Sequence, residues 1–167
     1  MTKQAASKPQ FVYVTYIRST RELVWDALRK PEFTSRYWFG VRQESEWKPG
    51  ASWKMLFEDG RVADAGEVVE YDPPRRLVLR WRNEFRPELK AEGYSRCVME
   101  LEQSGSAVKL TITHTLEGEG KKFIEAVSGG WPKVLAGLKT LLETGQPLET
   151  ESGCAGAKAA ASSEMHA

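Results

Sequence analysis

The sequence predicts an α+β fold of the helix-grip type, in which a curved antiparallel sheet of about seven strands surrounds a long C-terminal helix. Residues 41–116 are apolar at alternate positions and contain turn signals at short intervals, which is typical of antiparallel strands. Residues 121–144 instead place apolar side chains at helical spacing. This is the only long amphipathic helix available to cover the sheet, so we expect the sheet to curve around it.

The length and composition favour one folded domain. A chain of 167 residues can bury a core without disulfides or metal ions, and its formal net charge of +1 gives no reason to expect nucleic acid as a partner. We expect a flexible lead-in over residues 1–10, a folded domain over 11–144, and a disordered tail rich in Gly, Ala and Ser over 145–167. Cys97 and Cys154 lie in unlike contexts, which argues against a disulfide framework. No stretch is apolar enough for membrane insertion, and the expected location is cytoplasmic.

The first elements are a strand and a helix. Residues 11–17 are rich in aromatic and β-branched side chains and predict a strand. Ser19 and Thr20 follow it, and their hydroxyl groups can cap a helix that starts near Arg21. Pro31 ends the helical pattern.

Residues 32–39 predict either a second short helix or an aromatic loop. Strands are then expected over residues 41–47, 52–58, 61–71, 76–82, 94–103 and 107–116. Their connections are too short for parallel crossovers, so they should form an antiparallel meander that the first strand joins at its edge. Residues 82–93 carry charges of both signs and predict a solvated loop.

The last element is a helix with a broad apolar face. Its apolar residues are Val127, Trp131, Val134, Leu135, Leu138, Leu141 and Leu142. Because Pro132 follows Gly129 and Gly130, the helix either begins near Pro132 or bends there. Gly145 provides a C-terminal stop.

A cavity follows from this arrangement. One helix of about 10 Å diameter does not fill a curved sheet from end to end, and the inward positions carry large side chains. We therefore expect a site for a small apolar ligand, such as a lipid or a polyketide-like molecule. The predicted lining residues are Trp38, Trp53, Met55, Phe57, Trp81, Ile112, His114, Trp131 and Leu135.

The polar candidates for chemistry are few. His114 could act as an acid, a base or a hydrogen-bond donor, or could be a structural residue at the end of a strand. Asp64 could face inward, where it would need a partner such as His114, or outward as a surface charge, which we favour. Cys97 has no neighbouring His and fits a buried structural thiol. No motif indicates a metal or a cofactor.

The chain resembles the START-like (SRPBCC) superfamily, which shares its fold with Bet v 1-like proteins, and within it the group similar to the C-terminal domain of the activator of the heat-shock-protein-90 ATPase. The matching places are Val24 to Leu28 followed by Pro31-Glu32 and Tyr37-Trp38-Phe39, Gly66 to Leu77 with the diproline Pro73-Pro74, Lys109 to His114, and Gly130-Trp131. The resemblance implies a pocket between the long helix and the sheet, no bound metal, no universally shared catalytic group, and a link to the stress response.

Three functions are compatible with these residues. A protein that binds a small hydrophobic or aromatic ligand comes first, because no catalytic constellation is evident. The alternatives are an enzyme of the cyclase or hydrolase type that uses His114, and a module that binds a chaperone as the resemblance implies. An exposed edge strand could also pair to give a homodimer.

Overall fold

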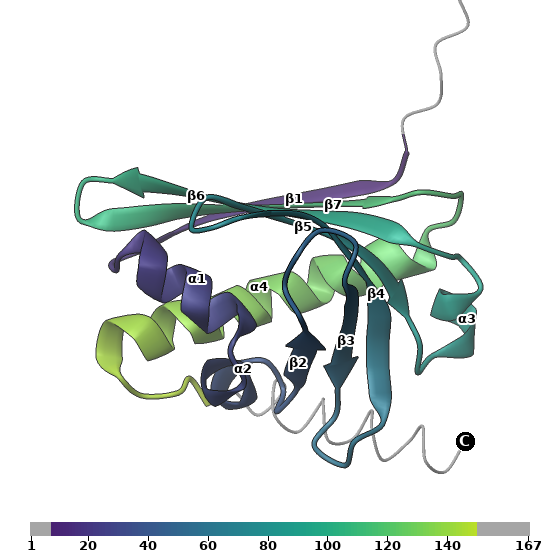
Figure 1. The fold of residues 1–167 in the computed structure, drawn as a ribbon, viewed down its shortest axis with the longest axis horizontal. Helices are drawn as coiled ribbons and strands as arrows, with labels where there is room; N and C mark the ends of the chain where they lie inside the picture. The colour runs from purple at the N-terminus through teal and green to yellow at the C-terminus, as the bar shows by residue number, and fades with distance from the viewer. Residues whose placement is uncertain (1–7, 150–167) are drawn as a thin grey trace, which may run out of the picture.

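The computed structural model describes residues 8–149. Most of the expected lead-in over residues 1–10 and of the expected tail over residues 145–167 falls outside the described residues. The elements are β1 (Gln10–Ile17), α1 (Arg21–Arg29), α2 (Pro31–Tyr37), β2 (Arg42–Ser45), β3 (Ser52–Leu56), β4 (Val62–Asp72), β5 (Arg76–Asn83), α3 (Pro87–Lys90), β6 (Ser95–Ser104), β7 (Ala107–Leu116) and α4 (Lys122–Thr144). Figure 1 shows α4 running along one face of the sheet.

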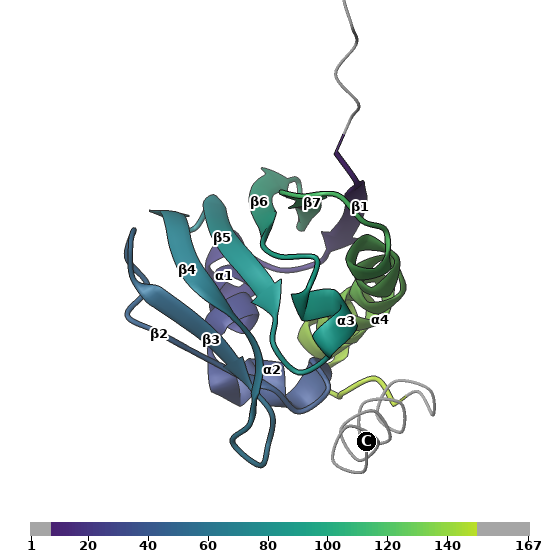
Figure 2. The ribbon, with the colours of Figure 1, turned by 90° about the vertical axis from the view of Figure 1, so that its right-hand side faces the viewer.

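The sheet is a single antiparallel meander with β1 added at one edge, which confirms the predicted fold class. The strand order is β1-β7-β6-β5-β4-β3-β2 in a seven-stranded sheet. Figure 2 shows how the sheet curves, with α4 on its inner side and α1 and α2 beside it. At Gly66 in β4 the neighbouring strand is so close that a Cβ atom would lie 1.7 Å from the carbonyl oxygen of Arg80. Only glycine fits at this position.

Two short helices help α4 to cover the sheet. Thr20 caps α1 by accepting a hydrogen bond from the backbone N–H of Leu23 at 3.2 Å. The segment that the sequence left open as a helix or a loop is the helix α2, and the hydroxyl of Tyr37 at its end donates to the carbonyl of Ala27 at 2.7 Å. This bond joins the two helices. The sheet is therefore covered by α4 together with α1 and α2, rather than by α4 alone.

Helix α4 is continuous from Lys122 to Thr144 and contains Pro132, so the alternative in which it begins near Pro132 is wrong. The carboxylate of Glu92 explains the earlier start, because it accepts hydrogen bonds from the backbone N–H groups of Lys122 and Phe123 at 3.1 and 2.8 Å. Gly145 ends the helix in the left-handed conformation, as predicted.

Part of the predicted solvated loop is a short helix, α3. Its residue Leu89 is only 3% exposed and belongs to the hydrophobic core. The surrounding charges concealed this apolar anchor in the sequence. The loop is consequently held against the body of the protein, next to the start of α4 (Figure 2).

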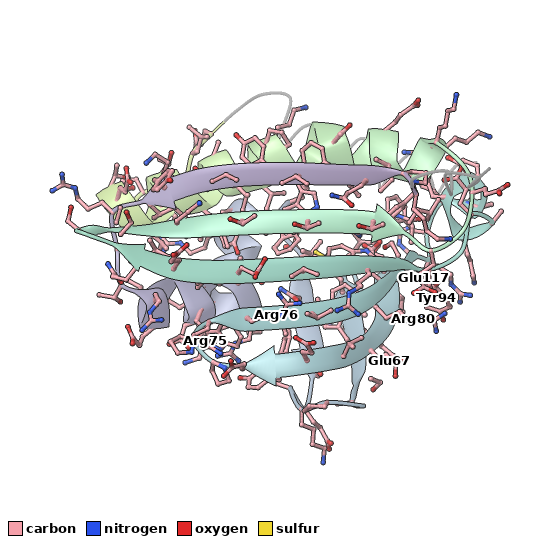
Figure 3. All side chains as sticks on the ribbon, turned by 90° about the horizontal axis from the view of Figure 1, so that it is seen from above. Glu67, Arg75, Arg76, Arg80, Tyr94 and Glu117 are labelled. Carbon is pink, nitrogen blue, oxygen red and sulfur yellow. The ribbon has the colours of Figure 1, made fainter. Side chains whose placement is uncertain are left out.

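The outer face of the sheet carries charges that pair with one another (Figure 3). Arg80 donates two hydrogen bonds to Glu117, at 2.8 and 3.0 Å, and its guanidinium lies 4.0 Å from the ring centre of Tyr94. Arg76 donates one hydrogen bond to Glu70 at 2.7 Å and one to Glu100 at 2.9 Å. These basic side chains are thus paired with carboxylates on the outer face of the sheet.

Candidate functional site

The candidate site is a pocket of about 470 Å³. It lies between β3, β4 and β5, the segment that follows α2, the loop around α3, and the first half of α4. Its lining residues are Trp38, Phe39, Val41, Met55, Phe57, Ala63, Asp64, Trp81, Asn83, Phe85, Arg86, Leu89, Phe123, Ala126, Val127, Gly129, Gly130, Trp131, Lys133 and Val134. The volume falls in the range of sites that bind small molecules.

Three indole rings form one wall of the pocket. Trp38 lies 5.2 Å from Trp131 and 6.3 Å from Trp81 between ring centres, and Trp81 lies 5.9 Å from Trp131. Phe57 and Phe85 meet edge to face at 4.9 Å. Aromatic faces of this kind offer a ligand a large apolar contact with defined geometry.

The structure brings five of the nine predicted lining residues to the pocket: Trp38, Met55, Phe57, Trp81 and Trp131. The other four, Trp53, Ile112, His114 and Leu135, lie in the core away from its wall, which differs from the prediction. Trp81 contacts the rings of both Trp53 and His114, at 4.8 and 5.0 Å, and lies between them and the pocket. Alternation along a strand identified which side chains point inward. It did not show which of those inward side chains reach the pocket and which are covered by the core.

His114 is fully buried and has a partner on each ring nitrogen. The indole N–H of Trp131 donates to Nδ1 at 3.1 Å, so the imidazole proton lies on Nε2 and faces the hydroxyl of Ser95 at 2.8 Å. Ser95 in turn donates to the carbonyl of Trp81 at 2.9 Å. Burial lowers the pKa of His114 to about 3. The ring is therefore neutral and structural, and it does not reach the pocket.

Asp64 lines the pocket and is 8% exposed, so the favoured interpretation of it as a surface charge is wrong. The indole N–H of Trp81, on the neighbouring strand, donates to its Oδ1 at 2.9 Å and provides the partner that a buried carboxyl needs. Burial raises the pKa of Asp64 to about 7, and the negative charge of Glu84 adds to this effect. Hydrogen bonds from Trp81 and Asn83 act in the opposite direction. Asp64 can thus exchange a proton near neutral pH.

Several lining residues were not predicted. The loop before α3 contributes Phe85 and Arg86, and α4 contributes Lys133 together with Gly129 and Gly130. A Cβ atom at either glycine would meet nothing within 4 Å, which shows that the pocket extends to the helix backbone there. Two adjacent glycines within an apolar helical pattern were the one signal that could have located this wall.

The remaining candidates do not contribute chemistry to the pocket. Cys97 is completely buried, and burial raises the pKa of its thiol above the usual range. Between residues 8 and 149, no three His, Cys, Asp or Glu side chains are grouped as a metal site would need. No helix in the same part of the chain is long and apolar enough to cross a membrane.

The fold and the pocket together define a helix-grip protein of the START-like class. A family model described as "Activator of Hsp90 ATPase homolog 1-like protein" matches residues 18–143, and the chain belongs to this family. The match confirms the resemblance read from the sequence. No curated protein sequence matched the chain significantly.

Solved structures with the same fold include proteins of different origin. ChR145 from Cytophaga hutchinsonii is 27% identical, with a TM-score of 0.64 and coverage of 83% of this chain and 97% of its own. An HSP90 activator from Plasmodium falciparum, PFC0360w, is 20% identical, with a TM-score of 0.65 and coverage of 80% and 96%. DynU16, a protein in the dynemicin biosynthetic locus, is 22% identical, with a TM-score of 0.66 and coverage of 83% of this chain. This chain spans about half of DynU16, 49% of its length.

Proposed function

We propose that the protein binds a small hydrophobic or aromatic ligand in the pocket beside α4. The observation that carries this proposal is the aromatic wall around a space of about 470 Å³. At about 30 Å³ for each water-sized group, such a space accommodates a ligand of roughly 15 non-hydrogen atoms. A short lipid or an aromatic molecule of two or three fused or linked rings has this size. The likeness to a protein from a biosynthetic locus supports a search among small biosynthetic molecules.

The apolar fluorophore N-phenyl-1-naphthylamine tests the proposal directly. Its fluorescence should rise on addition of the protein and saturate at one site. Gly130→Leu should abolish the rise, because a leucine side chain on α4 would project into the pocket without meeting another atom near its Cβ. Ala136→Leu is the matched control, since Ala136 is exposed on the same helix and does not line the pocket.

Two results would overturn this function. The fluorophore could fail to bind the natural protein at all, or Gly130→Leu could bind it as well as Ala136→Leu does. Leucine is a good helix former, so neither variant is expected to lose the fold. Circular dichroism of both proteins checks this point.

Stimulation of the Hsp90 ATPase is a second candidate function, and the family match favours it. Such an activity would use the outer surface of the protein rather than the pocket. An ATPase assay with Hsp90 from the same organism tests it, and the absence of stimulation at saturating protein would refute it. Gly130→Leu should leave any such stimulation unchanged, which separates the two functions.

An enzyme that uses His114 receives no support from the geometry. That mechanism needs the imidazole and a carboxylate on one pocket, whereas His114 lies behind Trp81 and both its nitrogens are engaged. A cytoplasmic location stays a prediction. So does homodimerisation, for which the edge strand β1 offers the exposed side chains Val12, Val14 and Tyr16; sedimentation of the purified protein would test it.

A further inference from the structure

We propose that the ligand is an amphipathic anion, with an apolar body against the indole wall and one carboxylate-like end directed at Arg86 and Lys133. This inference rests on the proposed function and specifies the chemical class of the ligand. It follows from how the polar groups are distributed over an otherwise apolar lining.

Both cations belong to the lining and have capacity for a further anion. Lys133 is exposed on α4, and no residue between 8 and 149 forms an ion pair with it. Arg86 contacts Glu88 at 2.8 Å through Nε and Nη2, and its Nη1 has no partner in the same part of the chain. A carboxylate can therefore bind Arg86 without displacing Glu88.

The two cations lie on two segments that both line the pocket. Arg86 comes immediately before α3, and Figure 2 shows α3 beside α4, the helix that carries Lys133. The backbone N–H of Arg86 donates to the side chain of Asn83 at 2.9 Å, which fixes where the loop leaves β5. The loop and α4 thus each contribute one positive charge to the pocket lining.

Asp64 is the acidic group of the pocket lining, and it disfavours an anion directly beside it. Asp64 is buried on β4, and its register partner on β5 is Asn83. A carboxyl group in this position repels a second carboxylate when it is ionised, but it can exchange a hydrogen bond with a ligand hydroxyl or carbonyl group. The charged end of a ligand is therefore directed toward Arg86 and Lys133, and an uncharged polar group is tolerated beside Asp64.

Competition against N-phenyl-1-naphthylamine tests this inference with a matched pair of probes, dodecanoate and dodecan-1-ol, at pH 8. The probes share one alkyl chain and differ in charge. We expect dodecanoate to displace the fluorophore at a concentration about tenfold lower than the alcohol, and this preference should shrink as salt is added. Lys133→Gln and Arg86→Gln should each reduce the preference about threefold or more, with little effect on the alcohol.

Lys122→Gln is the control, because Lys122 is an exposed lysine on the same helix that does not line the pocket. If Lys122→Gln reduced the preference as much as Lys133→Gln does, attraction by the general surface charge would explain the result and the inference would be wrong. Equal displacement by the acid and the alcohol would also overturn it, while leaving the proposed function intact. A fluorophore that does not bind at all would refute both.

Discussion

Replacement of Asp64 by asparagine is expected to stabilise the protein, and increasingly so as the pH rises. The amide side chain would keep an oxygen to accept the indole N–H of Trp81, now 2.9 Å from the carboxylate, but would remove the buried charge. Burial raises the pKa of Asp64 from 3.8 to about 7. Below pH 3.8 the carboxyl is protonated in both the folded and the unfolded chain, so it imposes no ionisation penalty there.

The penalty grows between these two pKa values, because the unfolded chain releases the proton while the folded protein retains it. Each pH unit in this window lowers the free energy of unfolding by about 1.4 kcal/mol. The cost of Asp64 is therefore about 2 kcal/mol at pH 5 and about 4 kcal/mol above pH 7. Relative to the natural protein, Asp64→Asn should gain about 2 to 3 kcal/mol more at pH 8 than at pH 5.

Urea denaturation followed by circular dichroism at both pH values measures this difference. Glu102→Gln is a suitable control, since it removes an exposed carboxylate from β6. The reasoning would be refuted if Asp64→Asn changed the free energy of unfolding equally at pH 5 and pH 8. That result would mean that Asp64 is solvated or strongly paired in its ionised form.

Four further substitutions test the fold around the pocket by urea denaturation. His114→Leu should cost about 2 to 3 kcal/mol by removing an acceptor from a buried indole N–H, and in the natural protein NMR should show a neutral imidazole with its proton on Nε2 at pH 5. Gly66→Ala should cost about 4 kcal/mol or more because its Cβ would meet the Arg80 carbonyl, whereas Gly129→Ala should gain up to about 1 kcal/mol. Glu92→Ala should cost about 1 kcal/mol by uncapping α4. A neutral result for Gly66→Ala, or a protonated imidazole at pH 5, would contradict the packing described here.

Secondary structure was largely predictable because its signals are local. Alternation and turn residues placed most strands within one or two residues of their observed ends, and the hydroxyl before Arg21 marked the start of α1. The signals left an alternative open where a distant residue decides the outcome. Helix α4 starts ten residues before Pro132 because Glu92, in another segment, satisfies its first N–H groups. No pattern within the helix itself records that contact.

The pocket was predictable in its chemistry but only partly in its residues. Large aromatic side chains on the inward face indicated an apolar site, and Trp81 and Trp131 do line it. Whether an inward side chain reaches the pocket depends on how far the sheet curves and on where α1 and α2 cover its inner face. Neither is set by the local sequence. The charge of Asp64 likewise suggested a position in solvent, because the sequence does not show its partner. The indole N–H of Trp81 on the next strand allows Asp64 to be buried.

The buried polar groups hold the indole wall in place. The N–H of Trp131 is held by His114, and the N–H of Trp81 is held by Asp64. Ser95 connects His114 to the carbonyl of Trp81, so the two indoles belong to one hydrogen-bonded network. Their aromatic faces are consequently fixed before a ligand arrives, and binding need not pay to order them. His114, although outside the pocket, should then affect ligand affinity through the orientation of Trp131 rather than through proton transfer.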